Sequence, residues 1–182
     1  MRPIIRRLAA LALLLPLGQP ALANLPEGAK APTFATKGAK AGKPFGFNLA
    51  TALRKGPVVL YFYPKAFTQG CTLEANAFAE ATPQFAAAGA TVIGMSADDL
   101  LTLQKFSTEA CRDKFAVAMA TPAIIKAYDV DLKREGVSTG LTTRTSYVIG
   151  QDGRVRFVHS NMDYRDHVRL TLAAVQGLRK KR

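Results

Sequence analysis

Residues 57–63 read PVVLYFY, an unbroken run of apolar, β-branched and aromatic side chains. A strand with one exposed face alternates apolar and polar residues, whereas a strand covered on both faces does not need to. We therefore expect residues 57–63 to form the central strand of a sheet that is covered on both sides. The rest of the chain is interpreted outward from this strand.

The segment after this strand has the pattern of a helix. We expect it to span residues 72–88, because Phe78 and Phe85 lie one heptad apart and Gly89 is a typical C-terminal stop. Pro83 falls inside this segment, where a proline removes a backbone donor and kinks the helix.

The next elements continue the alternation of strand and helix. Residues 90–95 are predicted to form a second buried strand. A helix is expected over residues 98–115, with Ser96 or Asp98 as its N-cap, and residues 124–128 form a short helical piece.

The C-terminal third has a different pattern. Two strands are predicted at residues 145–149 and 155–159, and Asp152-Gly153 between them is typical of a hairpin turn. A final helix is expected over residues 163–178. Residues 24–46 are rich in Gly, Pro, Ala and Lys and are interpreted as a loop-like lead-in.

This order of elements defines a fold class. Two strand–helix pairs followed by a hairpin and a helix favour an α/β protein with a mixed sheet flanked by helices. One edge of that sheet is expected to be antiparallel. A thioredoxin-like fold has this order, and no repeat or long linker divides the chain.

The N-terminus has the features of a signal peptide. Residues 1–23 begin with three arginines, continue with an apolar run over residues 8–17, and end in Ala-Leu-Ala. The run is too short for a membrane span, which needs about 20 residues. We expect cleavage after Ala23, one mature domain over residues 24–182, and a periplasmic or secreted location. The arginine pair at residues 6–7 leaves the general and the twin-arginine export routes both open.

Composition narrows the classes of function. The 182 residues carry a net charge of +12, which becomes +9 without residues 1–23, because these hold three arginines and no acid. The basic end at residues 179–182 suits a solvated helix terminus. No basic-aromatic stripe accompanies it, so a nucleic-acid partner is not expected. Two cysteines are too few for a disulfide scaffold or a four-ligand zinc site.

Cys71 is the residue most suited to chemistry. It follows the central strand at the start of the predicted helix, where unpaired N–H groups and the helix dipole favour a thiolate. Position alone leaves an inert core cysteine as an equal alternative. Thr68 occupies the place of the first cysteine in a CxxC pair, which argues against an ordinary dithiol oxidoreductase.

The segment around Cys71 resembles the active site of a known family. Pro64-x-x-x-Thr68-x-x-Cys71 matches the PxxxTxxC motif of peroxiredoxins, the AhpC/TSA-like family with a thioredoxin-like fold. Residues 58–75 resemble its bacterioferritin-comigratory, or Q-type, branch. Three further family-like segments follow in the family's order: Gly28-x-x-Ala31-Pro32-x-Phe34, Gly94-Met-Ser96-Ala-Asp98 and Arg144-Thr-Ser-Tyr147-Val-Ile149.

The resemblance implies an exported thiol peroxidase that reduces hydrogen peroxide and organic hydroperoxides. Cys71 would be the peroxidatic cysteine, which is oxidised to a sulfenic acid. Thr68 would hydrogen-bond the peroxide, Arg144 would stabilise the thiolate and the developing charge, and Pro64 would shield the sulfur from water. The resemblance implies no cofactor, no metal and no stable membrane anchor.

The second cysteine departs from the common pattern of this branch. Many members have a resolving cysteine five residues after the peroxidatic one, and here that position is Asn76. Cys111, late in the predicted helix over residues 98–115, is the remaining candidate. A thioredoxin-like or small-thiol reductant would then reduce a Cys71–Cys111 disulfide. A one-cysteine enzyme remains open, as does the choice between a monomer and a homodimer.

Two hypotheses from other classes compete with the peroxidase. One is a thioredoxin-like copper carrier, although the position that would complete a CxxxC pair is Ala75. The other is a periplasmic scaffold in which Cys71 and Cys111 form a structural disulfide.

Overall fold

The computed structural model describes residues 24–180, and the predicted signal peptide lies outside the described residues. The strands are β1 (Ala35–Lys40), β2 (Lys43–Asn48), β3 (Val58–Phe62), β4 (Thr91–Ser96), β5 (Ala116–Met119), β6 (Asp131–Arg134), β7 (Val137–Thr142), β8 (Thr145–Ile149) and β9 (Val155–Ser160). The helices are α1 (Leu49–Leu53), α2 (Gln69–Ala87), α3 (Leu100–Glu109), α4 (Pro122–Ala127) and α5 (His167–Lys180).

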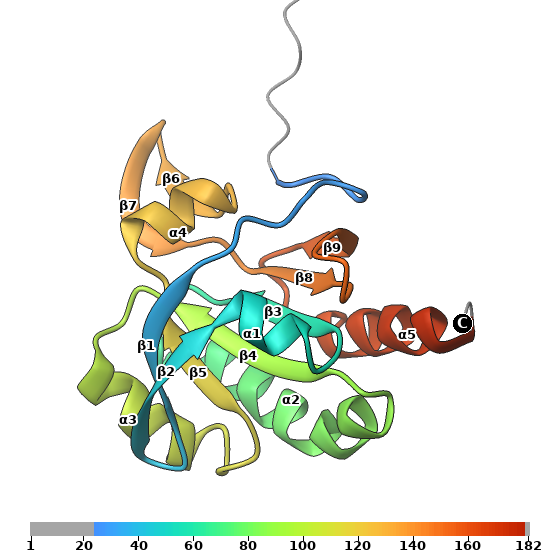
Figure 1. The fold of residues 1–182 in the computed structure, drawn as a ribbon. Helices are drawn as coiled ribbons and strands as arrows, with labels where there is room; N and C mark the ends of the chain where they lie inside the picture. Colours follow the sequence, from blue (N-terminus) through green and yellow to red (C-terminus); the bar gives the residue numbers. More distant parts are fainter. Residues whose placement is uncertain (1–23, 181–182) are drawn as a thin grey trace, which may run out of the picture.

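A seven-stranded mixed sheet organises the molecule, in the order β2-β1-β5-β4-β3-β8-β9. The inner strands β3, β4 and β5 are parallel, as expected for units joined by helices. Both edges are antiparallel: β1 pairs with β2 and β5, while β8 pairs with β3 and β9. Strands β6 and β7 form a separate hairpin, which projects near α4 in Figure 1.

The prediction for residues 57–63 is confirmed, because all five residues of β3 are buried. Its side chains alternate between two apolar clusters, as a strand in the middle of a sheet requires. Val59 and Tyr61 join one cluster with side chains of α2, α3 and α5. Leu60 and Phe62 join the other with side chains of α1 and α4. Figure 1 shows α2 and α5 on the same side of the sheet.

The interpretation of residues 24–46 as a loop-like lead-in is wrong from Ala35 onward. Residues from Ala35 onward form the antiparallel hairpin β1–β2, so the sheet has two antiparallel edges instead of one. Strand β2 reads KPFGFN and is mostly exposed, which is why its composition resembles that of a loop. Edge strands need little burial and tolerate Lys, Pro and Gly.

The helix boundaries also differ from the prediction. Helix α3 ends at Glu109 instead of extending to residue 115, and its N-cap is Asp99, whose carboxylate accepts from Thr102 N at 2.7 Å. Helix α2 begins three residues early, at Gln69. Helix α5 begins at His167, four residues late, because residues 161–166 are not helical.

Other sequence signals are confirmed. Helix α2 stops before Gly89, whose φ of +77° is a left-handed conformation that glycine adopts easily. The Asp152-Gly153 turn joins β8 to β9. The kink expected at Pro83 stays a prediction; helix α2 continues through this residue, which lies on its exposed side.

Within residues 24–180, no helix is both long enough and apolar enough to cross a membrane.

Candidate active site

Cys71 lies at the carboxyl end of the central strand, in the first turn of α2. Thr68 is the N-cap of this helix, and its carbonyl accepts the first helical bond from Thr72 N at 2.9 Å. The N–H groups of this turn have no partner inside the helix, so they and the helix dipole favour negative charge on a nearby sulfur. The side chain is almost fully buried, with 1% of Cys71 exposed.

The loop between β3 and α2 is held in place by Asp98. Its carboxylate accepts from the backbone N–H of Ala66 and from the Ser96 hydroxyl, both at 2.8 Å. Phe67 adopts a φ of +63°, which is unfavourable for a residue with a side chain and persists only where the surroundings hold it. Asp98 was predicted as a helix cap, but it anchors this loop instead.

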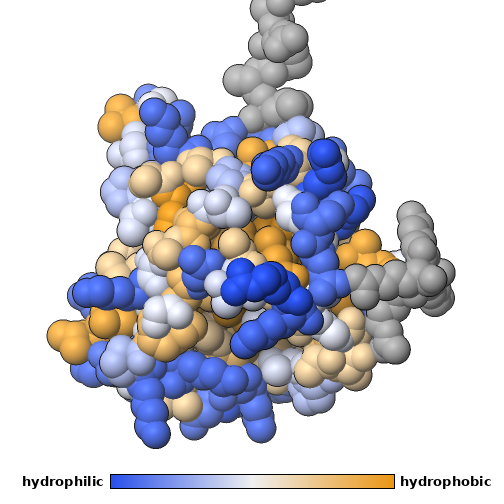
Figure 2. All heavy atoms as spheres, in the orientation of Figure 1, coloured by the Kyte–Doolittle hydropathy of each residue, from blue (hydrophilic) through white to orange (hydrophobic). Residues whose placement is uncertain are grey.

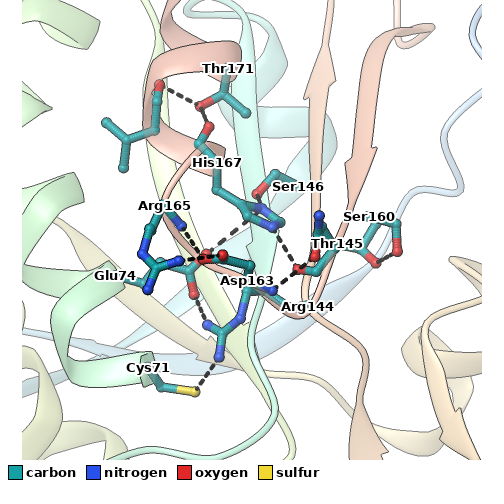
Figure 3. A network of polar contacts seen from close by, with 12 residues as sticks. Cys71, Glu74, Arg144, Thr145, Ser146, Ser160, Asp163, Arg165, His167 and Thr171 are labelled. Carbon is teal, nitrogen blue, oxygen red and sulfur yellow. Dashed lines mark hydrogen bonds and ion pairs between the residues drawn. The ribbon is translucent and has the colours of Figure 1, made fainter. Parts of the chain in front are cut away.

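Arg144 is brought to Cys71 by β8, the neighbour of β3 in the sheet, because it lies directly before the start of that strand. Its Nη2 lies 3.5 Å from Cys71 Sγ, within hydrogen-bond range for sulfur. Its Nε donates to the carbonyl oxygen of Met162 at 2.9 Å, and its Nη1 donates to the buried carboxyl group of Glu74. Figure 3 shows the guanidinium group between Glu74 and the sulfur. The guanidinium is therefore fixed on three sides.

Glu74 is one turn after Cys71 on α2 and is fully buried. Burial raises the pKa of Glu74 to about 8, although Arg144 acts in the opposite direction. Its second carboxylate oxygen, Oε1, has no hydrogen-bond partner among the described residues. A carboxyl that retains its proton near neutral pH leaves more of the positive charge of Arg144 available to the sulfur.

Gly70 permits the close approach of Arg144 to the start of α2. A Cβ atom at this position would lie 3.3 Å from Arg144 Nη2, closer than most real contacts of that kind. Tyr164 Cδ1 would be 3.9 Å away, an ordinary distance. The absence of a side chain at Gly70 therefore keeps space for the guanidinium group next to Cys71.

The two remaining motif residues flank the site. Pro64 is half-buried in the loop, and Thr68 is exposed. The Thr68 hydroxyl donates to the carbonyl oxygen of Lys65 at 3.0 Å and makes no capping bond to the helix. The structure thus brings Cys71 and Arg144 into contact and places Pro64 and Thr68 on the loop that leads to the sulfur.

Cys111 does not lie in a helix as predicted. It follows the C-cap residue Ala110, and its N–H donates to Phe106 O at 3.0 Å. It is fully buried in the same apolar cluster as Cys71, and burial raises the pKa of its thiol. Both cysteines are free in this structure.

His167 is a buried residue that the sequence did not indicate. His167 belongs to no sequence motif, yet it is fully buried and is bonded at both ring nitrogens. The available signal was spacing: His167, Thr171 and Val175 recur every four residues and share one buried face of α5.

Within the described residues, no group of three or more His, Cys, Asp or Glu side chains is placed to hold a metal ion.

Comparison with known proteins agrees with this site. The AhpC/TSA family matches residues 28–158. Peroxiredoxin Q of Suaeda salsa chloroplasts is 33% identical over 159 residues, which cover 86% of this chain and 71% of that protein.

Solved structures give the same result. Peroxidoxin BcpB of Mycobacterium tuberculosis superposes with a TM-score of 0.74 at 28% identity, covering 84% of this chain and 97% of that one. The bacterioferritin comigratory protein of Xanthomonas campestris gives a TM-score of 0.69 at 26% identity, over 78% of this chain and 90% of that one. The chain therefore belongs to the AhpC/TSA family and is a peroxiredoxin, an enzyme that reduces peroxides with a thiol.

Proposed function

We propose that Cys71 is the peroxidatic cysteine of this peroxiredoxin. The observation that carries the proposal is the 3.5 Å contact between Arg144 Nη2 and Cys71 Sγ in the first turn of α2. A fixed guanidinium and a helix N-terminus both stabilise negative charge, so they favour the nucleophilic thiolate over the thiol.

The reaction at the sulfur is a two-electron transfer. The Cys71 thiolate attacks the nearer oxygen of a hydroperoxide, so an S–O bond forms as the O–O bond breaks. The sulfur becomes a sulfenic acid, and the released alkoxide or hydroxide takes up a proton to leave as an alcohol or water. Hydrogen peroxide and organic hydroperoxides are the proposed substrates. Alkyl peroxide reduction is described for the Xanthomonas campestris relative.

The surrounding residues stabilise this transition state. Arg144 faces the sulfur, and its fixed N–H groups lie where charge develops on the peroxide, an effect worth about 3–4 kcal/mol per donor in other enzymes. Thr68 is assigned the hydrogen bond to the peroxide. Its hydroxyl is on the exposed side of the loop and is held by a single bond to Lys65 O, which a substrate oxygen could replace. Pro64, half-buried before them, limits the access of water.

We assign Cys111 the resolving role. Its thiol would condense with the Cys71 sulfenic acid to give a disulfide and one molecule of water, and a thioredoxin-type reductant would restore both thiols. A disulfide requires Cα atoms within about 7 Å. Cys111 is fully buried after the end of α3, and we expect this step to need local unfolding of the segment that carries it.

The peroxidase assignment is tested by replacing each cysteine in turn. We expect Cys71→Ser to abolish peroxide consumption in the presence of a thiol reductant. The matched variant Cys111→Ser should still consume one equivalent of peroxide per protein. Full peroxidase activity in Cys71→Ser would contradict the assignment.

The resolving role has a separate test. Mass spectrometry of the peroxide-treated protein should show a Cys71–Cys111 linkage. A persistent sulfenic acid on Cys71 with a free thiol on Cys111 would instead establish a one-cysteine enzyme, in which an external thiol attacks the sulfenic acid.

We also propose that the protein is exported and works in the periplasm or outside the cell. The support is the charge and hydropathy pattern of residues 1–23. N-terminal sequencing of the protein recovered from an exporting host should begin at Asn24. Recovery of the protein only from the cytoplasm, still starting at Met1, would contradict export.

A further inference from the structure

The polar network around Arg144 includes one ionisable residue that the chemistry described above does not use. His167, the first residue of α5, is fully buried. Its Nε2 lies 2.9 Å from the carbonyl oxygen of Asn161, and its Nδ1 lies 2.8 Å from the Ser146 hydroxyl. Figure 3 shows the ring between Ser146 on one side and the residues around Arg144 on the other.

These partners determine which nitrogen carries the proton. A carbonyl oxygen only accepts, so Nε2 must be the N–H donor to Asn161. Nδ1 is then free to accept from Ser146. Burial lowers the pKa of His167 to about 4, which agrees with a neutral ring. Nδ1 is 3.7 Å from Glu74 Oε1, and because the ring is neutral this approach is not an ion pair.

The Asn161 peptide group links His167 to Arg144. The Asn161 N–H donates to the Arg144 carbonyl oxygen at 3.1 Å, while the Asn161 carbonyl accepts from His167. The next carbonyl in the chain, that of Met162, accepts from Arg144 Nε at 2.9 Å. The loop at residues 161–162 thus holds both the backbone and the side chain of Arg144. This loop is itself exposed, and the buried imidazole of His167 bonds to it through the Asn161 carbonyl.

We propose that His167 is a positioning residue of the peroxidatic site: its Nε2–H fixes the loop at residues 161–162, and this loop holds Arg144 against Cys71. His167 touches neither the sulfur nor the substrate, so it acts only through Arg144. The proposal rests on the assignment of Cys71 and Arg144 given above. It predicts that loss of the Nε2–H donor lowers the rate of Cys71 oxidation, and that loss of the Nδ1 acceptor lowers this rate less.

Two substitutions separate the nitrogens of the ring. His167→Gln places an amide N–H near the position of Nε2, and His167→Asn retains an acceptor near Nδ1 but removes the donor to Asn161. The rate constant for oxidation of Cys71 by hydrogen peroxide is measured by rapid quenching and mass spectrometry. We expect His167→Asn to lower it about 10- to 100-fold, the effect of a small displacement of a catalytic group. His167→Gln should lower it less than fivefold.

The neighbouring histidine supplies a matched control. His159 packs against His167 in a T-shaped contact, with ring centroids 4.6 Å apart, but it has no bond to the loop at residues 161–162. His159→Gln should therefore react at the wild-type rate. Thermal unfolding of every variant confirms that it is folded at the assay temperature.

A double-mutant cycle excludes a merely structural role. In an Arg144→Lys background, His167→Asn should reduce the rate constant no further than twofold, because a residue that acts through Arg144 has no effect once Arg144 is lost. The proposal is overturned if His167→Asn reacts within twofold of wild type, or if it lowers the rate by the same factor in both backgrounds.

A second measurement does not require any His167 variant to fold. The chain has two histidines, so nitrogen-15 NMR of wild type and His159→Gln assigns both rings. His167 should be neutral with its proton on Nε2 between pH 5 and 8; a charged ring or a proton on Nδ1 would overturn the proposal. If wild-type Cys71 reacted with peroxide no faster than free cysteine, the peroxidase assignment would fail instead. The His167 tautomer would still show whether Nε2 donates to the Asn161 carbonyl.

Discussion

At the scale of residues, the chemistry depends on the guanidinium group of Arg144. Its three nitrogens are shared between the Cys71 sulfur, the Glu74 carboxyl and the Met162 carbonyl oxygen. Because the three partners lie in different directions, they hold the planar guanidinium group in one orientation. The resemblance to peroxiredoxins implied that Arg144 lies near Cys71, but it did not indicate the groups that fix Arg144, because these come from α2 and from the segment before α5.

Gly70 is predicted to control the position of Arg144. Gly70→Ala should lower the rate of Cys71 oxidation by hydrogen peroxide about tenfold, because the added methyl group crowds Arg144 Nη2. The free energy of unfolding should stay the same or rise by up to about 1 kcal/mol, since alanine favours a helix. Gly177→Ala in α5, where a methyl group meets nothing within 4 Å, is the control that should leave the rate unchanged. An unaltered rate in Gly70→Ala would refute this role.

The buried carboxyl of Glu74 is predicted to make stability depend on pH. In the native state Glu74 keeps its proton up to about pH 8, whereas in the unfolded chain it loses the proton near its ordinary pKa. The free energy of unfolding therefore falls as the pH rises between these two pKa values. His167, whose pKa is lowered to about 4, acts in the opposite direction below about pH 6.5. The net fall should therefore emerge between pH 6.5 and 8.

Urea unfolding in a Cys71→Ser background measures this effect without thiol ionisation. We expect the midpoint to fall between pH 6.5 and 8, and Glu74→Gln to remove most of that fall while keeping an acceptor for Arg144. The same fall in both proteins would show that another group is responsible.

At the scale of elements, the site is formed where β3 ends and α2 begins. The loop between them places Thr68 at the N-cap and Gly70 and Cys71 in the first turn of the helix. The fully apolar sequence of β3 predicted this junction, because a strand buried on both faces has few alternatives. The helix boundary was less predictable, since Gln69 and Gly70 are weak helix signals and the Thr68 hydroxyl does not cap the helix.

Two adjacent aspartates after β4 allow a test of the loop anchor. Asp98→Ala removes the acceptor for Ala66 N–H and the Ser96 hydroxyl. We expect a loss of about 1–3 kcal/mol in the free energy of unfolding, the usual effect of leaving such donors unpaired, together with slower oxidation of Cys71. Asp99→Ala removes only the cap of α3 and should leave that rate unchanged. If Asp98→Ala reacted at the wild-type rate, the anchor would not be needed for catalysis.

At the scale of the whole molecule, the parallel centre of the sheet was predictable and its edges were less so. Continuous burial made β3 and β4 recognisable, and the Asp152-Gly153 turn marked the β8–β9 hairpin. The β1–β2 hairpin and the separate β6–β7 hairpin are mostly exposed, so no hydrophobic periodicity marked them. The burial of His167 depends on contacts between α2, β8 and α5, which lie far apart in the sequence.

The position of Cys111 predicts a local opening of the structure. If Cys111 resolves the Cys71 sulfenic acid, the end of α3 and the turn after it must leave the core. Hydrogen exchange should then be faster across residues 100–116 in the oxidised wild-type protein than in the reduced one. Cys111→Ser treated with peroxide should show no such change. A disulfide that forms without any loss of protection would contradict this opening.

The central claim is that Arg144, held by Glu74 and the Met162 carbonyl, activates Cys71 toward peroxides. The most direct test is the second-order rate constant of Cys71 with hydrogen peroxide at pH 7, in wild type and in Arg144→Lys, which retains the charge but loses the planar fork. We predict a fast reaction in wild type and a loss of about 100-fold or more in Arg144→Lys. Equal rate constants in the two proteins, or a wild-type rate no higher than that of free cysteine, would contradict the claim.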